Sequence, residues 1–359
     1  MNAHAALRRA LATLILAASS LLPASLAFGD PLPGRDVLKF SQRPMDGTTI
    51  VNDAGGTTRY WGHDELSTAY SSAAATAPRI YQGVFMADDF ADKFSSPVVH
   101  VKWWGSYLNN FQTPEFPVDK FLISFESDIP QSPNNPFSRP GEPLLNQIVR
   151  RVPAGGSLTP GSGTYTEKPI SSGGAPLFES LYEYNAELHL GKEFFQKPDT
   201  VYWLKIVALV DLPAGVPIDP PPTFAPRWGW HNRDYTIFDP LASTAPAVVP
   251  GEFLSGTIGG GPVAAPIWHF QDDAVTGRIF VDTAGPMGEI MPVIDQSEYR
   301  PTNYLPLADG PEQIGQYSKD LAFELYTLAP EPGGCGLLAA GVFALALRQK
   351  YNRIFPPFK

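Results

Sequence analysis

Proline and glycine recur along the chain, and their spacing constrains the fold more than any other feature. The 359 residues include 38 prolines and 32 glycines, with no repeat period of the collagen kind. Inside a helix each proline costs about 3 kcal/mol and each glycine about 1 kcal/mol relative to alanine. The pattern therefore favours short strands joined by many turns over long helices.

Several stretches alternate between apolar and polar residues with a period of two, which is typical of strands. In residues 181–190, LYEYNAELHL, Tyr184 lies on one face and Glu183 and Glu187 lie on the other. This strand is predicted to be half buried, with its polar face in water. Further strands are predicted in residues 121–130, 277–282 and 320–326.

Residues 201–210, VYWLKIVALV, are apolar on both faces apart from Lys205, which is typical of a central strand. Turn-rich segments such as residues 130–143 connect the strands, and none has helical periodicity. We therefore expect an all-β fold, an antiparallel β-sandwich of jelly-roll type with long Pro/Gly-rich loops. An N-terminal signal helix and a short C-terminal transmembrane helix would flank it. No loop is typical of a linker, so one domain is expected over residues 28–329.

Charge and cysteine content exclude several classes of function. The formal net charge is −10 and the body of the chain has no basic stripe, so nucleic acid is not expected as a partner. Cys335 is the single cysteine, which excludes an internal disulfide and a zinc site built on thiolates. No cofactor is expected, apart from calcium bound through oxygen ligands.

The N-terminus has the three parts of a secretory signal peptide. Arg8 and Arg9 precede an apolar run over residues 10–22, and small residues lie at Ser25 and Ala27. We expect residues 1–27 to be the signal peptide, cleaved after Ala27, and the remainder to be exported. An uncleaved N-terminal anchor is the alternative.

Near the C-terminus, Pro330-Glu331-Pro332 precedes an apolar segment over residues 333–347. At 1.5 Å per residue, a helix of this length spans roughly 22 Å, which is short of the ~30 Å hydrocarbon core. The bases that follow fit a cytoplasmic tail. They are Arg348, Lys350 and Arg353. A short buried helix that closes the fold is the alternative.

This order of parts, over residues 330–359, resembles the PEP-CTERM sorting signal of bacterial exported proteins. The resemblance implies processing by an exosortase-type membrane enzyme. It also implies a protein at the cell surface or outside the cell, anchored transiently in the membrane through its C-terminal segment. The tail YNRIFPPFK is longer and more apolar than the usual run of arginines. Cys335 is either a packing residue of this helix or a site of lipidation.

The body carries a second resemblance. LKFSQRP from Leu38, FMADDF from Phe85, VKWWGSYL from Val101 and RWGWHNR from Arg227 occur in this order. They are similar to stretches of a group of uncharacterised bacterial secreted domains, often found with this C-terminal signal. The resemblance extends over most of residues 36–327 and implies an architecture but no activity.

Pairs of acidic residues are the candidates for a metal site. Loop carboxylates suit Ca²⁺, although neighbours in a strand point to opposite faces and the spacing of a calcium loop is missing. Asp88 and Asp89 have a second interpretation, in which they bond backbone amides at a strand end. The calcium candidates are Asp88, Asp89, Asp272 and Asp273.

Tryptophan rings either stack on sugars or fill the core. Two pairs of carboxylates lie on the same face of a predicted strand: Glu126 with Asp128, and Glu183 with Glu187. Such a pair suits a glycosidase if its two carboxylates converge across a cleft. A solvated strand face also explains both pairs. No zinc-site histidine pair, nucleophile motif or nucleotide motif is present, so no catalytic residue is assigned. The candidate ligand-binding residues are Trp104, Trp228, Trp230 and Trp268.

The leading hypothesis is an exported cell-surface or extracellular-matrix protein without enzymatic activity, in a structural or adhesive role. Its expected partners are the exosortase-type enzyme, the membrane and extracellular polysaccharide. The alternative is a carbohydrate-binding module or a polysaccharide-acting enzyme. The two hypotheses differ in whether the four candidate tryptophans line one exposed groove.

Overall fold

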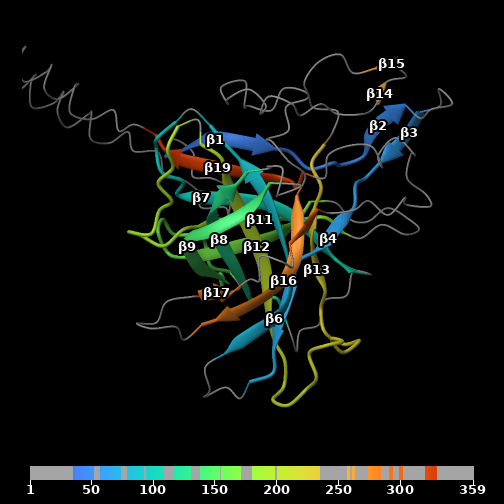
Figure 1. The fold of residues 1–359 in the computed structure, drawn as a ribbon, viewed down its shortest axis with the longest axis vertical. Helices are drawn as coiled ribbons and strands as arrows, with labels where there is room; N and C mark the ends of the chain where they lie inside the picture. The colour runs from blue at the N-terminus through green and yellow to red at the C-terminus, as the bar shows by residue number, and fades with distance from the viewer. Residues whose placement is uncertain are drawn as a thin grey trace, which may run out of the picture.

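β-Strands form all the regular elements of the part of the chain that the structure describes (Figure 1). The expected all-β class is therefore confirmed. The computed structural model describes residues 35–51, 57–73, 79–92, 94–108, 117–130, 138–153, 155–170, 180–198, 200–234, 257–258, 261–262, 274–283, 291–293, 299–301 and 320–329.

The described strands include the five that were predicted from the sequence. The first nine are β1 (Asp36–Gln42), β2 (Thr48–Val51), β3 (Thr57–Tyr60), β4 (Asp64–Leu66), β5 (Thr68–Ser71), β6 (Ile80–Phe90), β7 (His100–Tyr107), β8 (Lys120–Ile129) and β9 (Arg139–Arg151). The others are β10 (Thr164–Pro169), β11 (Tyr182–Glu187), β12 (Tyr202–Asp211), β13 (Trp228–His231), β14 (Thr257–Ile258), β15 (Gly261–Pro262), β16 (Val275–Asp282), β17 (Met291–Val293), β18 (Arg300–Pro301) and β19 (Phe323–Leu328). The five stretches predicted from their patterns correspond to β8, β11, β12, β16 and β19.

Most of these strands belong to one large sheet. Its main path runs β1-β19-β7-β11-β10-β9-β8-β12-β5-β6-β16-β17, and β13 pairs with both β7 and β4. Most neighbours are antiparallel, but β9 with β10 and β5 with β12 pair in parallel. The sheet is therefore mixed rather than antiparallel as expected. The alternation within a strand does not encode the direction of the strand that it pairs with.

The sheet folds over, so that two of its parts enclose the main core. Phe40 of β1 and Phe323 of β19 meet Phe90 of β6 at ring-centroid distances of 5.9 and 6.3 Å. Trp103 of β7 meets Phe121 of β8 at 5.2 Å. Edge-to-face packing of this kind adds to the free energy gained by burial. β12 is buried along both faces, as predicted for a central strand, and a second apolar cluster covers its other side.

The polar face of β11 is buried, contrary to the solvated face that its alternation predicted. Glu183, Asn185 and Glu187 are exposed by only 9%, 2% and 1%. Alternation correctly predicts which side chains share a face of a strand. Whether that face meets water depends on what packs over it, which a local pattern does not encode.

The first and last strands of the described chain are neighbours (Figure 1). β1 and β19 pair antiparallel with Asp36 opposite Leu328, and the amide of Ala329 donates to the carbonyl of Arg35 at 2.6 Å. β19 also pairs with β7 along its other edge, so it lies inside the sheet. The start of β1 and the end of β19 therefore leave the sheet at the same place.

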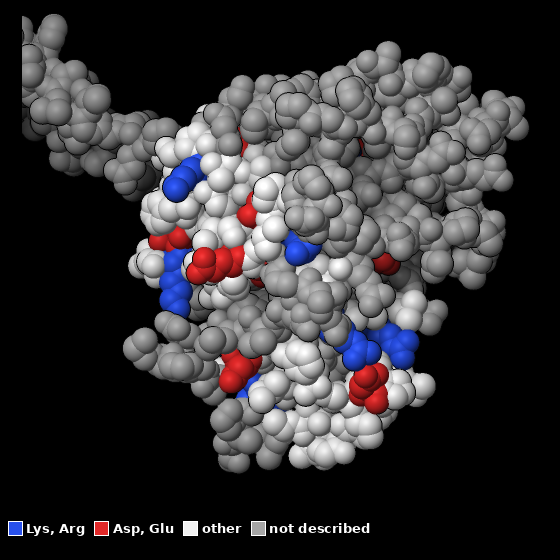
Figure 2. Space-filling view, in the orientation of Figure 1, with Lys and Arg blue, Asp and Glu red and all other residues white. Residues whose placement is uncertain are grey.

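The two segments predicted to meet a membrane, residues 1–27 and 330–359, lie outside the described residues. Within the described residues, no helix has the length and apolar character needed to cross a membrane. On the face drawn in Figure 2, described basic and acidic side chains are interspersed. Arg79 and Asp211 form a partly exposed ion pair, with Nη1 and Oδ1 3.1 Å apart.

Candidate functional site

One face of the β19-β7-β11 region carries a buried row of polar side chains, which we call the polar face. Trp103 and Tyr184 sit opposite each other in the register and point into the core. Their neighbours Lys102 and Asn185 are also opposite each other, and they point to the other side. The polar face consists of Ser41, His100, Lys102, Trp104, Glu183, Asn185, Glu187, Glu324 and Tyr326, with Arg35 and Asp36 at one end.

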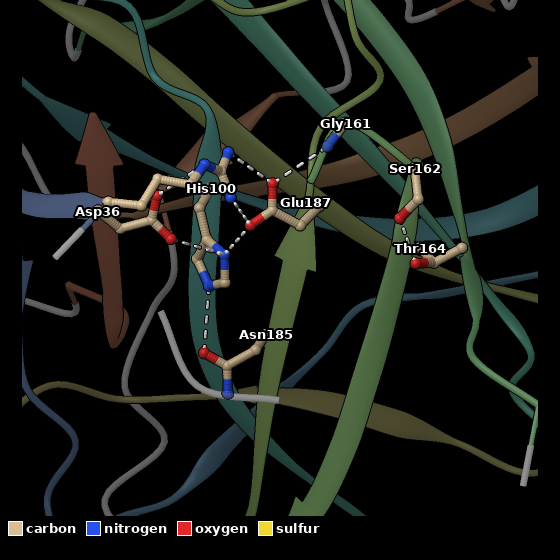
Figure 3. A network of polar contacts seen from close by, with 8 residues as sticks. Asp36, His100, Gly161, Ser162, Thr164, Asn185 and Glu187 are labelled. Carbon is tan, nitrogen blue, oxygen red and sulfur yellow. Dashed lines mark hydrogen bonds and ion pairs between the residues drawn. The ribbon is translucent and has the colours of Figure 1, made fainter. Parts of the chain in front are cut away.

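At that end, Glu187 is the centre of a hydrogen-bond network (Figure 3). Both carboxylate oxygens of Glu187 accept hydrogen bonds from the guanidinium of Arg35, at 2.8 and 3.0 Å. Its Oε1 lies 3.1 Å from His100 Nδ1, and its Oε2 accepts from the amide of Gly161 at 3.3 Å. Asp36 completes the group, with Oδ2 4.0 Å from His100 Nδ1 and Oδ1 3.5 Å from Arg35 Nε.

At the other end, Lys102 lies between two carboxylates. Its Nζ is 2.9 Å from Glu183 Oε2 and 3.9 Å from Glu324 Oε2. Glu324 also accepts hydrogen bonds from Ser41 Oγ, at 3.0 Å, and from the hydroxyl of Tyr326. These contacts join β1, β19, β7 and β11 through side chains as well as through the backbone.

Burial and ion pairing have opposite effects on the charged groups of the polar face. Burial alone would raise the pKa of Glu187, but the hydrogen bonds and charges of His100 and Arg35 outweigh it and hold that pKa below its ordinary value. Burial alone would lower the pKa of Arg35, but Glu187 and then Asp36 together outweigh it and raise that pKa. In Tyr326, burial and then the charge of Glu324 raise the pKa of the hydroxyl. Glu187 and Arg35 therefore keep their charges because they neutralise each other.

Asp36, His100 and Glu187 are the ligand set that the polar face offers to a metal ion. One ligand atom from each lies within 4.8 Å of the other two, and among the described residues this is the group of three that meets this condition. Sequence reasoning missed the group, since His100 and Glu187 are 87 residues apart and only the pairing of β7 with β11 joins them. The available signal was the alternation in β11, which put Glu187 on a polar face.

A pocket lies elsewhere, between β6, β16 and the loop at residues 218–221. Its volume is about 630 Å³ with the open mouth included. Phe280, exposed by 45%, lies at this pocket together with Tyr70 and the polar side chains of Gln82, Asp219 and Arg278. None of the residues predicted as a ligand site from the sequence lines it.

The described candidate tryptophans are all buried. Trp104, Trp228 and Trp230 are exposed by 4%, 0% and 0%. Trp228 Nε1 donates to the Tyr184 hydroxyl at 3.0 Å, and Trp230 Nε1 donates to the Ala322 carbonyl at 2.9 Å. Trp228 and Trp230 are therefore residues of the main core, and Trp104 is buried with Leu181 and Ala322 on the side of the polar face. None of the three presents its ring at an open groove.

Asp88 and Asp89 lie in β6 and are both fully buried. Asp88 Oδ1 accepts a hydrogen bond from the amide of Asp89 at 3.0 Å, and its Oδ2 accepts from the amide of Leu321 at 2.7 Å. Burial, and then the nearby Asp320, raise the pKa of Asp88 well above its ordinary value. This geometry supports the interpretation that Asp88 bonds backbone amides, rather than the calcium interpretation.

A solvated strand face, one of the two explanations for Glu126 and Asp128, does not hold for Glu126. Glu126 is fully buried and ion-paired, with Oε1 2.6 Å from Lys205 Nζ. Asp128 is half-buried and accepts hydrogen bonds from Ser138 Oγ at 2.6 Å and from Trp203 Nε1 at 2.9 Å. Both carboxylates bond neighbouring strands, because the sheet brings donors to them that the local alternation does not reveal.

Several residues singled out in the sequence lie outside the described residues, and their roles stay predictions. They are Trp268, Asp272, Asp273, Pro330, Glu331, Pro332, Arg348, Lys350 and Arg353. Ala329, bonded to Arg35, is the residue that precedes the predicted sorting motif.

A second polar cluster surrounds His231 at the end of β13. Its Nδ1 lies 3.1 Å from Asp64 Oδ1 and its Nε2 lies 2.8 Å from the carbonyl of Met45. Both neighbours only accept hydrogen bonds, so both ring nitrogens carry protons. Burial alone would lower the pKa of His231, but Asp64 and then Met45 outweigh it and raise that pKa above 6.5. Gly62, at φ +88°, fits here because a Cβ would lie 2.5 Å from His231 Nε2.

This cluster predicts a pH dependence of stability. Because the folded state raises the pKa of His231, its contribution is complete below about pH 6.5 and is lost as pH rises through the folded-state pKa. Urea denaturation from pH 5.5 to 9 is expected to show wild type losing its advantage over His231→Gln as pH rises. Asp64→Asn, which removes the charge that raises the pKa, should flatten the same curve. An advantage that is constant with pH would contradict a charged His231.

The fold and the polar face define an all-β protein in which buried charged side chains form ion pairs and hydrogen bonds between strands that are distant in sequence. The chain belongs to the family described as a domain of unknown function (DUF7901), whose model matches residues 38–263, more than half of the chain. β16 pairs with β6 and β19 with β1 and β7, so strands beyond the matched residues complete the same sheet. No curated protein and no solved structure matches the chain.

Proposed function

We propose that this chain is an exported protein held at the cell surface by its C-terminal sorting signal, with a structural or adhesive role. In this proposal residues 1–27 direct export, and Pro330-Glu331-Pro332 is recognised by an exosortase-type enzyme. The apolar segment at residues 333–347 is a transient membrane helix, and the basic residues after it stay on the cytoplasmic side. The processed body is released or attached to extracellular polysaccharide. The finer description of the body as a jelly-roll sandwich belongs to the same proposal.

The observation that carries the proposal is the position of β19. It ends at Leu328, one residue before Ala329 and two before the sorting motif. β1 bonds one edge of β19 and β7 bonds the other, so tension on the C-terminal anchor would act along hydrogen bonds on both sides of the strand. An interior strand resists such tension better than an edge strand, because more backbone hydrogen bonds must break together. The interior position of β19 therefore suits a body that carries load through its C-terminal anchor.

Replacing Pro330, Glu331 and Pro332 together by alanine is expected to abolish processing and surface display. The measurement is the ratio of unprocessed to processed chain in the native host, with fractionation of membrane, surface and medium. The control replaces Pro213 and Pro217, which lie in an exposed turn, by alanine. The proposal is wrong if the triple variant is processed and displayed like wild type and like the control.

A further inference from the structure

Three strands that are distant in sequence bring two carboxylates and an imidazole to one point (Figure 3). Asp36 begins β1, His100 begins β7 and Glu187 ends β11. The exposed fractions of these side chains are 0%, 0% and 1%. Such a set is typical of a metal site, because ions bind where a folded chain holds several donor atoms away from water.

Asn185 determines which nitrogen of His100 faces the carboxylates. Its Nδ2 donates to Glu183 Oε1 at 3.0 Å, so its Oδ1 is the atom that lies 3.2 Å from His100 Nε2. A carbonyl oxygen only accepts, so Nε2 carries a proton and Nδ1 points at Glu187 and Asp36. Metal-binding histidines are oriented in this way, by a hydrogen bond from the nitrogen that does not bind the ion.

The charges of the polar face leave room for a cation. Four carboxylates, from Asp36, Glu183, Glu187 and Glu324, face only three basic groups: the side chains of Arg35 and Lys102 and the imidazole of His100. Arg35 pairs with Glu187 at the point where the ligand atoms meet, but its side chain is exposed by 26%. Arg35 can therefore turn toward water, which would leave Asp36 and Glu187 to a different cation.

We propose that Asp36, His100 and Glu187 bind a divalent first-row transition-metal ion of the Zn²⁺ type, with Arg35 as the internal cation that the ion displaces. One imidazole and two carboxylates suit such an ion better than Ca²⁺, which prefers six to eight oxygens. Ligands about 2.1 Å from one ion lie about 3.0–3.5 Å apart. The distance of 3.1 Å from His100 Nδ1 to Glu187 Oε1 fits this, and Asp36 Oδ2, at 4.0 Å, must approach slightly.

A bound ion would join β1 directly to β7 and β11, across β19. Asp36 is opposite Leu328 in the register, so the site lies where the chain leaves the sheet toward its C-terminal segment. The ion would thus strengthen the corner at which both ends of the body emerge. The inference stands on the ligand geometry and does not depend on the proposed sorting function.

The test is Zn²⁺ binding to the full chain, purified without a histidine tag and treated with EDTA. Titration calorimetry, with elemental analysis after dialysis, is expected to give one equivalent per chain in wild type. Asp36→Asn and His100→Asn should weaken binding by at least about tenfold, and Arg35→Gln should tighten it. His189→Gln, which changes a histidine outside the cluster, should bind like wild type. Ca²⁺ in place of Zn²⁺ should bind more weakly.

Arg35→Gln keeps the proposal falsifiable if a ligand variant fails to fold, because it retains all three ligands and removes the competing cation. The site is refuted if neither wild type nor Arg35→Gln binds Zn²⁺. It is equally refuted if Asp36→Asn and His100→Asn bind Zn²⁺ as tightly as wild type, since the ion would then lie elsewhere. A rise in the melting temperature with Zn²⁺ in Arg35→Gln, lost when Asp36→Asn is added, would support it.

Discussion

Glu126→Leu is expected to lower the free energy of unfolding by about 3–5 kcal/mol, because it leaves Lys205 buried without its counter-charge. Both side chains are fully buried. Lys205 Nζ lies 2.6 Å from Glu126 Oε1, 3.4 Å from the Tyr299 hydroxyl and 4.4 Å from the centroid of the Phe85 ring. Burial lowers the pKa of Lys205 and Glu126 opposes it, so losing Glu126 removes the main support of the charged amine.

The double variant Glu126→Leu with Lys205→Met separates the ion pair from simple packing. Apolar residues of similar volume replace a buried pair at little net cost, so the double variant should lie within about 1 kcal/mol of wild type or above it. Urea denaturation of wild type, both single variants and the double variant gives the coupling energy. Glu142→Gln, at an exposed position, is the control and should change stability by less than about 0.5 kcal/mol. Additive losses in the double variant would contradict a coupled buried pair.

The sequence predicts best those strands that are buried on both faces. β12 is apolar on both sides and occupies the centre of the sheet, because a strand covered on both faces leaves this mark in its own residues. Lys205 was the one break in that pattern, and its partner Glu126 comes from β8. The local pattern thus revealed that Lys205 is a charged residue in an apolar strand, but it did not reveal that Glu126 neutralises its charge.

The candidate site was beyond sequence reasoning for a different reason. His100 stands opposite Glu187 in β11 and opposite Tyr326 in β19, so its neighbours depend on the register of three strands. The parallel pairing of β5 with β12 depends equally on long-range order. Alternation predicted the correct face of β11 for Glu187 but wrongly placed that face in water. Arg35, which precedes β1, and His100 of β7 contact the Glu187 carboxylate instead. Charges that look like a solvated edge in one strand become a buried network only when the sheet is assembled.

Trp228→Ala is expected to lower the free energy of unfolding by about 3–5 kcal/mol, a large part of the 5–15 kcal/mol that is typical of a folded domain. The indole is fully buried and its ring centroid lies 4.9 Å from Phe121 and 5.8 Å from Tyr184. Its strand, β13, bonds both β7 and β4. Gly105 lies against the ring, where a Cβ would be 2.5 Å from Trp228 Cζ2, so the site is shaped for this indole.

Trp228→Phe keeps most of the apolar contact but removes the donor to the Tyr184 hydroxyl, and should cost less than Trp228→Ala. Phe195→Ala removes an aromatic side chain that is 70% exposed and is the matched control, with an expected change below about 0.5 kcal/mol. Urea denaturation measures all three variants, and a glycan array on the same preparations measures ligand binding. If Trp228→Ala were as stable as wild type and lost glycan binding, Trp228 would be a ligand contact and the core assignment would be wrong.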